Sequence, residues 1–142
     1  MIEKDPNGKT PSDPGSKLDA GKNRLGLVID GFARALWAVG EVGTYGAMKY
    51  TDNGWQLVEG GIERYRDADY RHKLRQAMGE GYDPETELLH AAHAAWNALA
   101  HLDLLIRESE KNSAGGVVYK KPEGTPSKLT MPGDLQWTEE HF

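Results

Sequence analysis

The sequence contains no cysteine, so neither a disulfide framework nor thiolate chemistry is available to the chain. It has no apolar run close to the roughly 20 residues of a membrane-spanning helix, and its N-terminus lacks the apolar middle region of a signal peptide. We therefore expect a cytoplasmic protein that does not bind membranes. The net charge of −5 argues against nucleic acid as a partner, because general binding to nucleic acid needs a basic surface.

Apolar side chains are also scarce at both ends of the chain. Residues 1–20 are mostly Asp, Pro, Gly, Lys and Ser, and residues 109–142 are polar and rich in Pro and Gly. We therefore predict a flexible N-terminal segment over 1–20, a helical domain over 21–108 and a polar C-terminal extension over 109–142, with a short extended piece at 116–119. A unit as small as the middle part buries only about 60–65% of its unfolded surface. Such cores often gain stability by oligomerising, so we expect a homo-oligomer.

Helical periodicity dominates the middle of the chain. Apolar or small residues recur every three or four positions over 30–50, which is the period of an α-helix. The small residues between 40 and 47 predict a face on which another backbone packs closely. The turn at 53–54 has no alternating strands around it, so it predicts a loop between helices. A second helix is predicted from residue 60 or 61 to residue 78, where the glycine-rich run 79–81 stops it.

A third helix is predicted from Asp83 and Pro84 to residue 107. Asp83 can cap free backbone N–H groups, and Pro84 suits the first helical position, where no N–H is needed. The Ala- and Leu-rich sequence that follows strongly favours helix. The predicted fold class is therefore all-α, with poorly structured N- and C-terminal tails.

A polar stripe runs along this third helix. At 100° per residue, four side chains fall within about 80° of the helix circumference: His90, His93, Asn97 and His101. Because the rest of the helix is mostly Ala and Leu, the stripe is expected to face inward, where polar groups need partners. Two interpretations stay open. The stripe is either a polar seam satisfied by other side chains, or a site wall that supplies a metal ligand, an acid–base group and an amide for the substrate.

Acidic side chains provide the other candidates for chemistry. Two or three converging carboxylates can hold magnesium, with water and phosphate oxygens completing its coordination. Asp67 lies between arginines on the second helix, although an i,i+4 pair with Arg71 on a solvated face would also explain it. Glu41 fits a metal ligand as well as a surface acid. Asp83 and Glu85 could join a metal site, or could serve only as a cap and as a favourable charge at a helix start.

Basic and aromatic residues accompany these acids. Lysine and arginine suit phosphate, which arginine binds at two points, and Tyr50 or Trp55 could stack on a base. A single basic or aromatic residue usually belongs to the surface or to the core. Only the grouping of several such residues favours a substrate-binding site. The candidates for substrate binding are Lys22, Arg24, Lys49, Tyr50, Asn53, Trp55, Arg64, Arg71, His72 and Asn97.

Four strings of residues are together similar to a known family. They are residues 22–28, residues 45–50 with 54–55, residues 64–72, and residues 83–100. In this order and spacing they resemble a phage-encoded family of dATP/dGTP diphosphohydrolases. These are MazG-like enzymes, which include the MazZ type of phages whose DNA carries 2-aminoadenine. The resemblance covers about residues 22–105, most of the part that can fold.

The resemblance implies a MazG-like helical bundle that works as a dimer or tetramer in the host cell cytoplasm. It implies Mg²⁺ or Mn²⁺ as cofactor. It also implies hydrolysis of a purine deoxynucleoside triphosphate, dGTP before dATP, to the monophosphate and pyrophosphate. In a 2-aminoadenine phage, the dGMP would feed synthesis of the modified purine nucleotide. The broader MazG group is marked by Glu-x-x-Glu and Glu-x-x-Asp on successive helices. This chain has no Glu-x-x-Glu, and its one Glu-x-x-Asp, from Glu80 to Asp83, spans a predicted turn.

The ligands are therefore predicted from acid placement and from the strings that resemble the family. The predicted metal ligands are Glu41, Asp67, Asp83, Glu85 and His90. One of Asp67, Glu85 and His93 is expected to orient the attacking water or to take its proton.

Two other functions compete with this prediction. A triphosphohydrolase that releases the nucleoside commonly uses an adjacent His-Asp pair, and the sequence has none. The second alternative is a non-catalytic helical oligomer that binds a host protein or a nucleotide. In that case His90, His93 and Asn97 could be replaced by Ala or Leu without loss of function.

Overall fold

The computed structural model describes residues 3–112, so the predicted C-terminal extension and its extended piece lie outside the described residues. The elements are α1 (Gly26–Ile29), α2 (Ala33–Lys49), the 3-10 helix η1 (Gly54–Leu57), α3 (Gly61–Ala77) and α4 (His90–Asn112). Over the described range the one β-type pairing is an isolated bridge between Tyr82 and Leu89. The prediction of an all-α chain is therefore confirmed.

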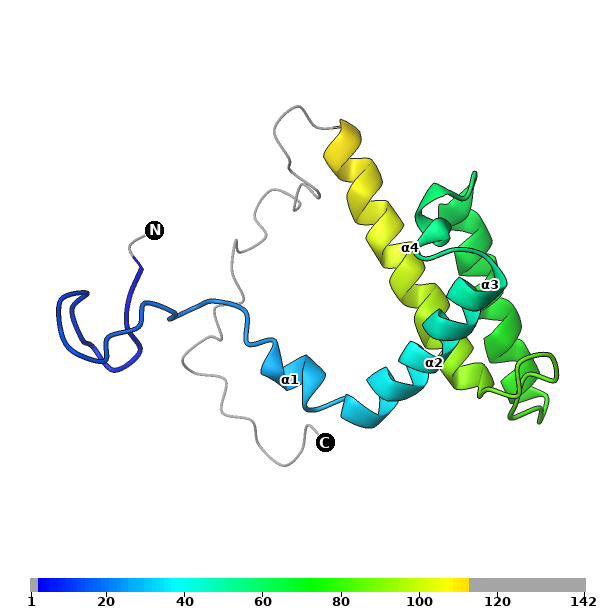
Figure 1. Ribbon diagram of the computed structural model, residues 1–142, viewed down its shortest axis with the longest axis horizontal. Coiled ribbons are helices and arrows are strands. Elements are labelled where there is room, and N and C mark those ends of the chain that lie inside the picture. The colour runs from blue at the N-terminus through cyan, green and yellow to red at the C-terminus, as the bar shows by residue number, and fades with distance from the viewer. Residues whose placement is uncertain (1–2, 113–142) are drawn as a thin grey trace, which may run out of the picture.

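The core lies where α2 and α3 pack against α4, with α3 and α4 side by side along much of their length (Figure 1). Small side chains on α4 make this close approach possible, and Ala92, Ala94 and Ala100 are all buried. At the start of α3, a Cβ on Gly61 would lie 2.9 Å from the Leu104 Cδ1 atom, so glycine permits the contact there. The core is thus built from close helix contacts rather than from many large apolar side chains.

Trp96 of α4, which is half-buried, contacts three other elements. Its ring stands edge-on to Trp55 of η1, with centroids 6.0 Å apart, and edge-on to Tyr65 of α3 at 5.6 Å. A Cβ on Gly43 would lie 3.2 Å from the indole Nε1 atom, so α2 meets the same ring. The predicted packing face of α2 is therefore confirmed at Gly43. At Gly40 and Gly46, by contrast, an added Cβ would meet no atom within 4 Å in the described part of the chain.

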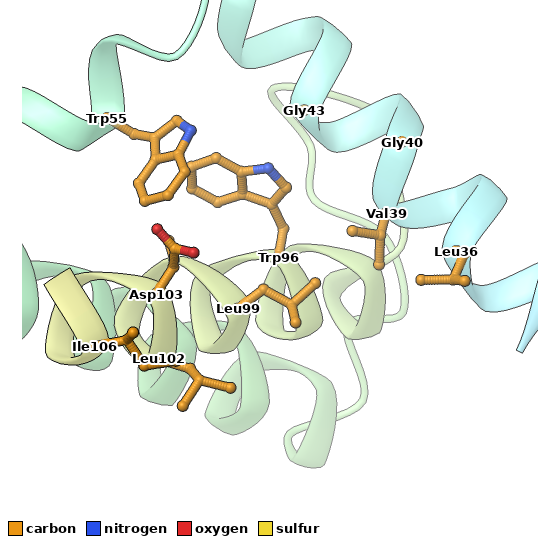
Figure 2. Close-up of a pocket in the computed structure, with 11 residues that line it drawn as sticks. Leu36, Val39, Gly40, Gly43, Trp55, Trp96, Leu99, Leu102, Asp103 and Ile106 are labelled. Carbon is orange, nitrogen blue, oxygen red and sulfur yellow. The ribbon is translucent and has the colours of Figure 1, made fainter. Parts of the chain in front are cut away.

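An apolar groove of about 460 Å³ separates α2 from α4 (Figure 2). Its walls include Leu36 and Val39 of α2, and Leu99, Leu102 and Ile106 of α4. Leu99 and Leu102 are each 50% exposed, so much of this apolar surface is open.

The second predicted helix is confirmed as α3, and the first corresponds to α2, which starts at Ala33 instead of residue 30. The predicted start of the third helix is wrong: α4 begins at His90, not at Asp83. Asp83 does cap, because its Oδ1 accepts the backbone N–H of Glu85 at 2.9 Å, but the capped unit is an isolated turn. Glu87 then takes a φ of 60°, in the left-handed region, which prevents the turn from continuing as helix.

The stretch before α1 contains turns held by the carboxylates of Asp5 and Asp13, of which Asp5 is the buried one. Asp5 accepts the backbone N–H groups of Asn7 at 2.7 Å and Lys17 at 2.6 Å, and is itself buried. These hydrogen bonds, the one from Lys17 first, hold the pKa of Asp5 below its usual value. The domain boundaries at residues 20 and 108 stay predictions. Among the described residues, no helix has both the length and the apolar character needed to cross a membrane.

Candidate functional site

A cleft of about 1170 Å³ opens between α2, η1, α3 and the turn that precedes α4. Most of the residues predicted for the site line it. They are Lys49, Tyr50, Asn53, Trp55, Arg64, Asp67, Arg71, His72, Asp83, Glu85, His93 and Asn97. The structure thus gathers, around one hollow, residues spread over about fifty positions of the sequence.

Four predicted residues lie elsewhere. Lys22 pairs with Glu3 at 3.2 Å, and Arg24 is exposed in the stretch before α1. Glu41 is exposed on α2, outside the lining of the cleft. His90 is fully buried behind the cleft wall. The roles predicted for these four stay predictions, and the Nδ1 atom of His90 lies 2.8 Å from that of His72, which lines the cleft.

A cross-link spans one side of the cleft. Lys49 of α2 donates to Oε1 of Glu85 in the turn before α4, and the Tyr45 hydroxyl donates to the same oxygen at 3.4 Å. The hydrogen bond and charge of Lys49 hold the pKa of Glu85 below its ordinary value, and Glu85 raises the pKa of Lys49 in return. Both groups are therefore charged near neutral pH, and the pair faces the cleft.

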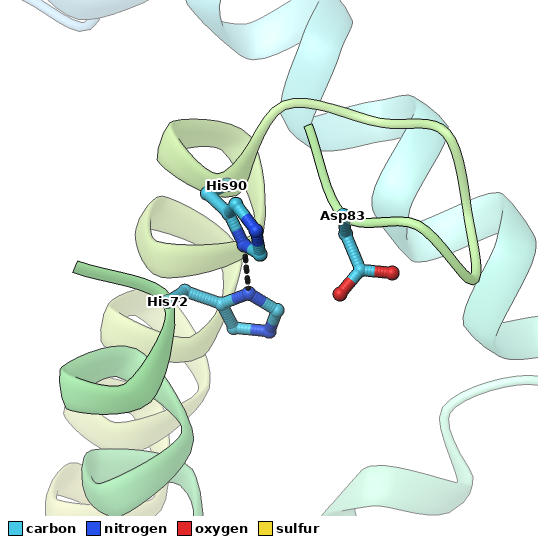
Figure 3. Close-up of side chains that lie close together, drawn as sticks. All are labelled: His72, Asp83 and His90. Carbon is cyan, nitrogen blue, oxygen red and sulfur yellow. Dashed lines mark hydrogen bonds between the residues drawn. The ribbon is translucent and has the colours of Figure 1, made fainter. Parts of the chain in front are cut away.

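Three histidines form a cluster on another side of the cleft. The Nδ1 atom of His72 on α3 lies 2.8 Å from the Nδ1 atom of His90 on α4 (Figure 3). The ring of His72 also stacks on that of His93, with centroids 4.5 Å apart and planes 9° from parallel. Burial, followed by the two neighbouring imidazoles, lowers the pKa of His72 to about 4. Burial lowers the pKa of His93 as well, so both rings are neutral at pH 7.

Asp83 stands beside this histidine cluster. Its Oδ1 accepts hydrogen bonds from the backbone N–H groups of Glu85 and Thr86, at 2.9 and 3.0 Å, and from the Thr86 hydroxyl. Burial alone would raise the pKa of Asp83, but the backbone hydrogen bonds outweigh it and the pKa lies below its ordinary value. One ligand atom each from His72, Asp83 and His90 lie within 4.8 Å of one another. Among the described residues, this is the group of three side chains placed to hold one metal ion.

The polar stripe of α4 faces inward, as predicted. His90 is 0% exposed, and His93 and Asn97 are buried. Asn97 donates back to the His93 carbonyl of its own helix, while the His101 Nδ1 atom lies 2.8 Å from the Ile62 carbonyl of α3. Along the stripe, His101 thus contacts the backbone of α3, whereas His93 and Asn97 line the cleft. Both interpretations of the stripe stay predictions.

Sequence reasoning missed three polar residues near these groups. Glu80 Oε1 lies 2.7 Å from His90 Nε2, and Thr86 Oγ1 lies 2.7 Å from His93 Nε2. Both sit in the irregular stretch between α3 and α4, where no periodicity marks them. Asp69, rather than Asp67, is the buried carboxylate of α3, with Oδ2 bound by Lys73 and Oδ1 without a hydrogen bond among the described residues. A helical wheel places Asp69 on the same face of the helix as His72, and this signal could have identified Asp69.

Comparison with known proteins gives two matches. A family model described as "dATP/dGTP diphosphohydrolase, N-terminal" matches residues 12–114, which include every residue that lines the cleft. A protein of Salmonella phage PMBT28, named "dATP/dGTP diphosphohydrolase", is 41% identical over 81 residues. That alignment covers 57% of this chain and 26% of the relative, so the chain spans about a quarter of the relative's length. No solved structure matches the chain.

Proposed function

The chain belongs to the dATP/dGTP diphosphohydrolase N-terminal family, and from this premise we propose that its cleft hydrolyses a purine deoxynucleoside triphosphate to the monophosphate and pyrophosphate. The observation that carries the proposal is the cleft itself, where basic, acidic and aromatic side chains converge. Its volume of about 1170 Å³ exceeds the range of about 300–1,000 Å³ usual for small-molecule sites, so a nucleotide with three phosphates has room.

The triphosphate would lie against the basic side chains of the cleft. Lys49, Arg64 and Arg71 all line it, and Arg64 and Arg71 stand on one helix, seven residues apart. Arginine can bind two phosphate oxygens at once, whereas lysine acts as a point charge. Tyr50, which follows Lys49, and Trp55 of η1 also line the cleft and would stack on the base, and Asn97 would contact base or sugar.

Mg²⁺ or Mn²⁺ fits this cleft as a partner of the phosphates. Asp67, Asp83 and Glu85 offer the hard oxygen donors that such ions prefer, and all three line the cleft. Magnesium is usually held by one or two carboxylates together with substrate phosphates, so three protein carboxylates on one ion are not required. When bound, the ion would screen the phosphate charge and lower the pKa of a water molecule.

We assign the proton acceptor for the attacking water to His93. Burial keeps its imidazole neutral at pH 7, so it has a free lone pair to accept a proton. Glu85 is a weaker candidate, because Lys49 holds its pKa below the ordinary value. Asp67 is exposed on the cleft wall and would orient the water or a phosphate-bound ion.

We also propose that the chain works as a homo-oligomer in the host cytoplasm, without nucleic acid as a partner. The support is the open apolar groove between α2 and α4, together with a core whose buried apolar side chains are mostly alanine. Exposed apolar surface of this kind marks an association face in soluble proteins. A second copy of the chain that covers this groove would enlarge a marginal core.

The decisive experiment incubates the purified 142-residue chain with each of the four deoxynucleoside triphosphates plus Mg²⁺ or Mn²⁺, and separates the products by chromatography. We expect monophosphate and pyrophosphate from dGTP, and more slowly from dATP, with EDTA abolishing the reaction. Nucleoside plus triphosphate would establish the competing triphosphohydrolase reaction. Absence of turnover with either metal would refute the enzyme proposal and favour a non-catalytic binding protein.

The use of the product is a further part of the proposal. The dGMP would supply synthesis of the 2-aminoadenine nucleotide if the source phage makes modified DNA. Base analysis of DNA from phage that lacks this gene tests the point. Loss of 2-aminoadenine supports it, and an unchanged base composition contradicts it.

A further inference from the structure

Two histidines on different helices present the same ring atom to each other. The Nδ1 atoms of His72 on α3 and His90 on α4 are 2.8 Å apart. A neutral imidazole has one protonated nitrogen and one with a lone pair, so a single proton lies between the two rings. Two nitrogens that face each other across a shared proton are also the arrangement from which a metal ion can displace that proton.

Glu80 fixes the ring of His90. The Glu80 Oε1 atom lies 2.7 Å from His90 Nε2, and an ionised carboxylate only accepts, so Nε2 carries a proton. In the neutral form of His90, the lone pair is then on Nδ1, directed at His72. Because the His90 side chain is fully buried, the surrounding protein holds its ring in this orientation. A carboxylate bound to the outer nitrogen of a histidine is the support that metal-ligating histidines typically have.

Asp83 supplies an acidic oxygen next to the two nitrogens. Its hydrogen bonds from Glu85 and Thr86 all fall on Oδ1 among the described residues, which holds the carboxylate in one orientation. Figure 3 shows Asp83 on the loop before α4, across from the two facing rings. One ligand atom from each of the three residues lies within 4.8 Å of the others.

We propose that His72, Asp83 and His90 form a binding site for a first-row transition-metal ion of the Zn²⁺ class, such as Zn²⁺ or Co²⁺. Imidazole nitrogen suits these ions, whereas Mg²⁺ prefers oxygen ligands only. Two nitrogens on a tetrahedral Zn²⁺ are about 3.3 Å apart, given Zn–N bonds of about 2.0–2.1 Å. The two Nδ1 atoms, 2.8 Å apart, would therefore have to separate by about half an ångström, and the rings would have to turn so that both nitrogens point at the ion.

The site leaves coordination positions open toward the cleft. His72 and Asp83 line the cleft, and His90 closes the site from behind. Three protein ligands with an open fourth position are typical of catalytic zinc sites, where water or substrate completes the shell. The ion would thus face the same space as the nucleotide while using different ligands from a phosphate-bound Mg²⁺, except at Asp83.

The experiment titrates the tag-free, metal-stripped 142-residue chain with Zn²⁺ by calorimetry, and with Co²⁺ by visible absorption, in excess Mg²⁺. We expect one ion per chain, and at least tenfold weaker binding in His72→Ala and in Asp83→Asn. Glu80→Gln should weaken binding about 10–100-fold, since it acts through His90. His101→Ala is the matched control and should bind like the wild type, because its ring contacts the Ile62 carbonyl away from the site.

A second measurement needs no variant. During Zn²⁺ titration, imidazole nitrogen NMR signals of His72 and His90 should shift at Nδ1, while those of His101 stay in place. If Zn²⁺ and Co²⁺ do not bind, or if the shifts occur at other histidines only, the contact is a structural hydrogen-bond chain and the proposal is wrong. Neither measurement contains nucleotide, so its result is independent of the hydrolysis assay.

Discussion

Lys49 of α2 donates a hydrogen bond to Glu85, 36 residues further along the chain, and so ties α2 to the turn before α4. The Tyr45 hydroxyl reaches the same carboxylate oxygen. Both charged groups are partly exposed to the cleft, so an incoming phosphate would compete with Glu85 for the lysine. The ion pair therefore contributes both to the arrangement of the cleft walls and to the charge inside the cleft.

Replacing Lys49 by methionine tests its role in phosphate binding. The change keeps most of the side-chain length but removes a charged donor, and hydrogen bonds to charged groups contribute about 1.5–3 kcal/mol. We expect KM for dGTP to rise about tenfold or more. The control is Lys73→Met, because Lys73 pairs with Asp69 on α3 and does not line the cleft. Equal KM values for both variants and the wild type would remove Lys49 from the substrate site.

Arg71→Ala tests the second basic group of the cleft. Arg71 is exposed and lines the cleft, so its removal should raise KM or lower kcat while leaving the far-ultraviolet circular dichroism and Tm unchanged. Arg34→Ala is the matched control, because Arg34 is exposed on α2 and lies outside the cleft lining. An Arg71 variant with wild-type kinetics would show that this side chain does not hold the phosphates.

Part of this cleft could be predicted because the sequence pattern within a single helix is enough to place some of its residues. His93 and Asn97 sit among Ala and Leu on a strongly helical segment, so their inward orientation follows from helical periodicity alone. The contact between His72 and His90 is different. It depends on how α3 is rotated against α4, and no periodicity within either helix determines that rotation.

Asp83 illustrates a second limit of sequence reasoning. A capping aspartate followed by proline is equally suited to a helix and to a single turn, because both begin with free backbone N–H groups. What separates the two is Glu87, whose positive φ ends the turn, and the bridge between Tyr82 and Leu89 that closes the loop. The displaced helix start leaves Glu85 in the loop, where it meets Lys49.

His101→Ala should separate structure from catalysis along the polar stripe. The His101 ring bonds the Ile62 carbonyl and ties α4 to the first turn of α3. Loss of one such hydrogen bond costs about 1 kcal/mol, so the midpoint of urea unfolding should fall while kcat and KM of the remaining folded enzyme stay unchanged. His93→Gln should show the reverse, with a large loss of kcat and a smaller effect on stability. A loss of kcat in His101→Ala at full folding would place the whole stripe in the active site.

The groove between α2 and α4 allows a direct test of self-association. Leu102 is half exposed in this groove, so Leu102→Glu would place a charge in the centre of an interface without disturbing the monomer core. We expect the wild type to sediment as a dimer or larger species and Leu102→Glu to sediment at the monomer mass of 15.7 kDa. Leu57→Glu is the control, because Leu57 is 90% exposed on η1 and does not line the groove. If Leu102→Glu keeps the wild-type mass, or the wild type is itself monomeric, a second copy does not cover this groove. If both glutamate variants dissociate, the association face extends beyond the groove to η1.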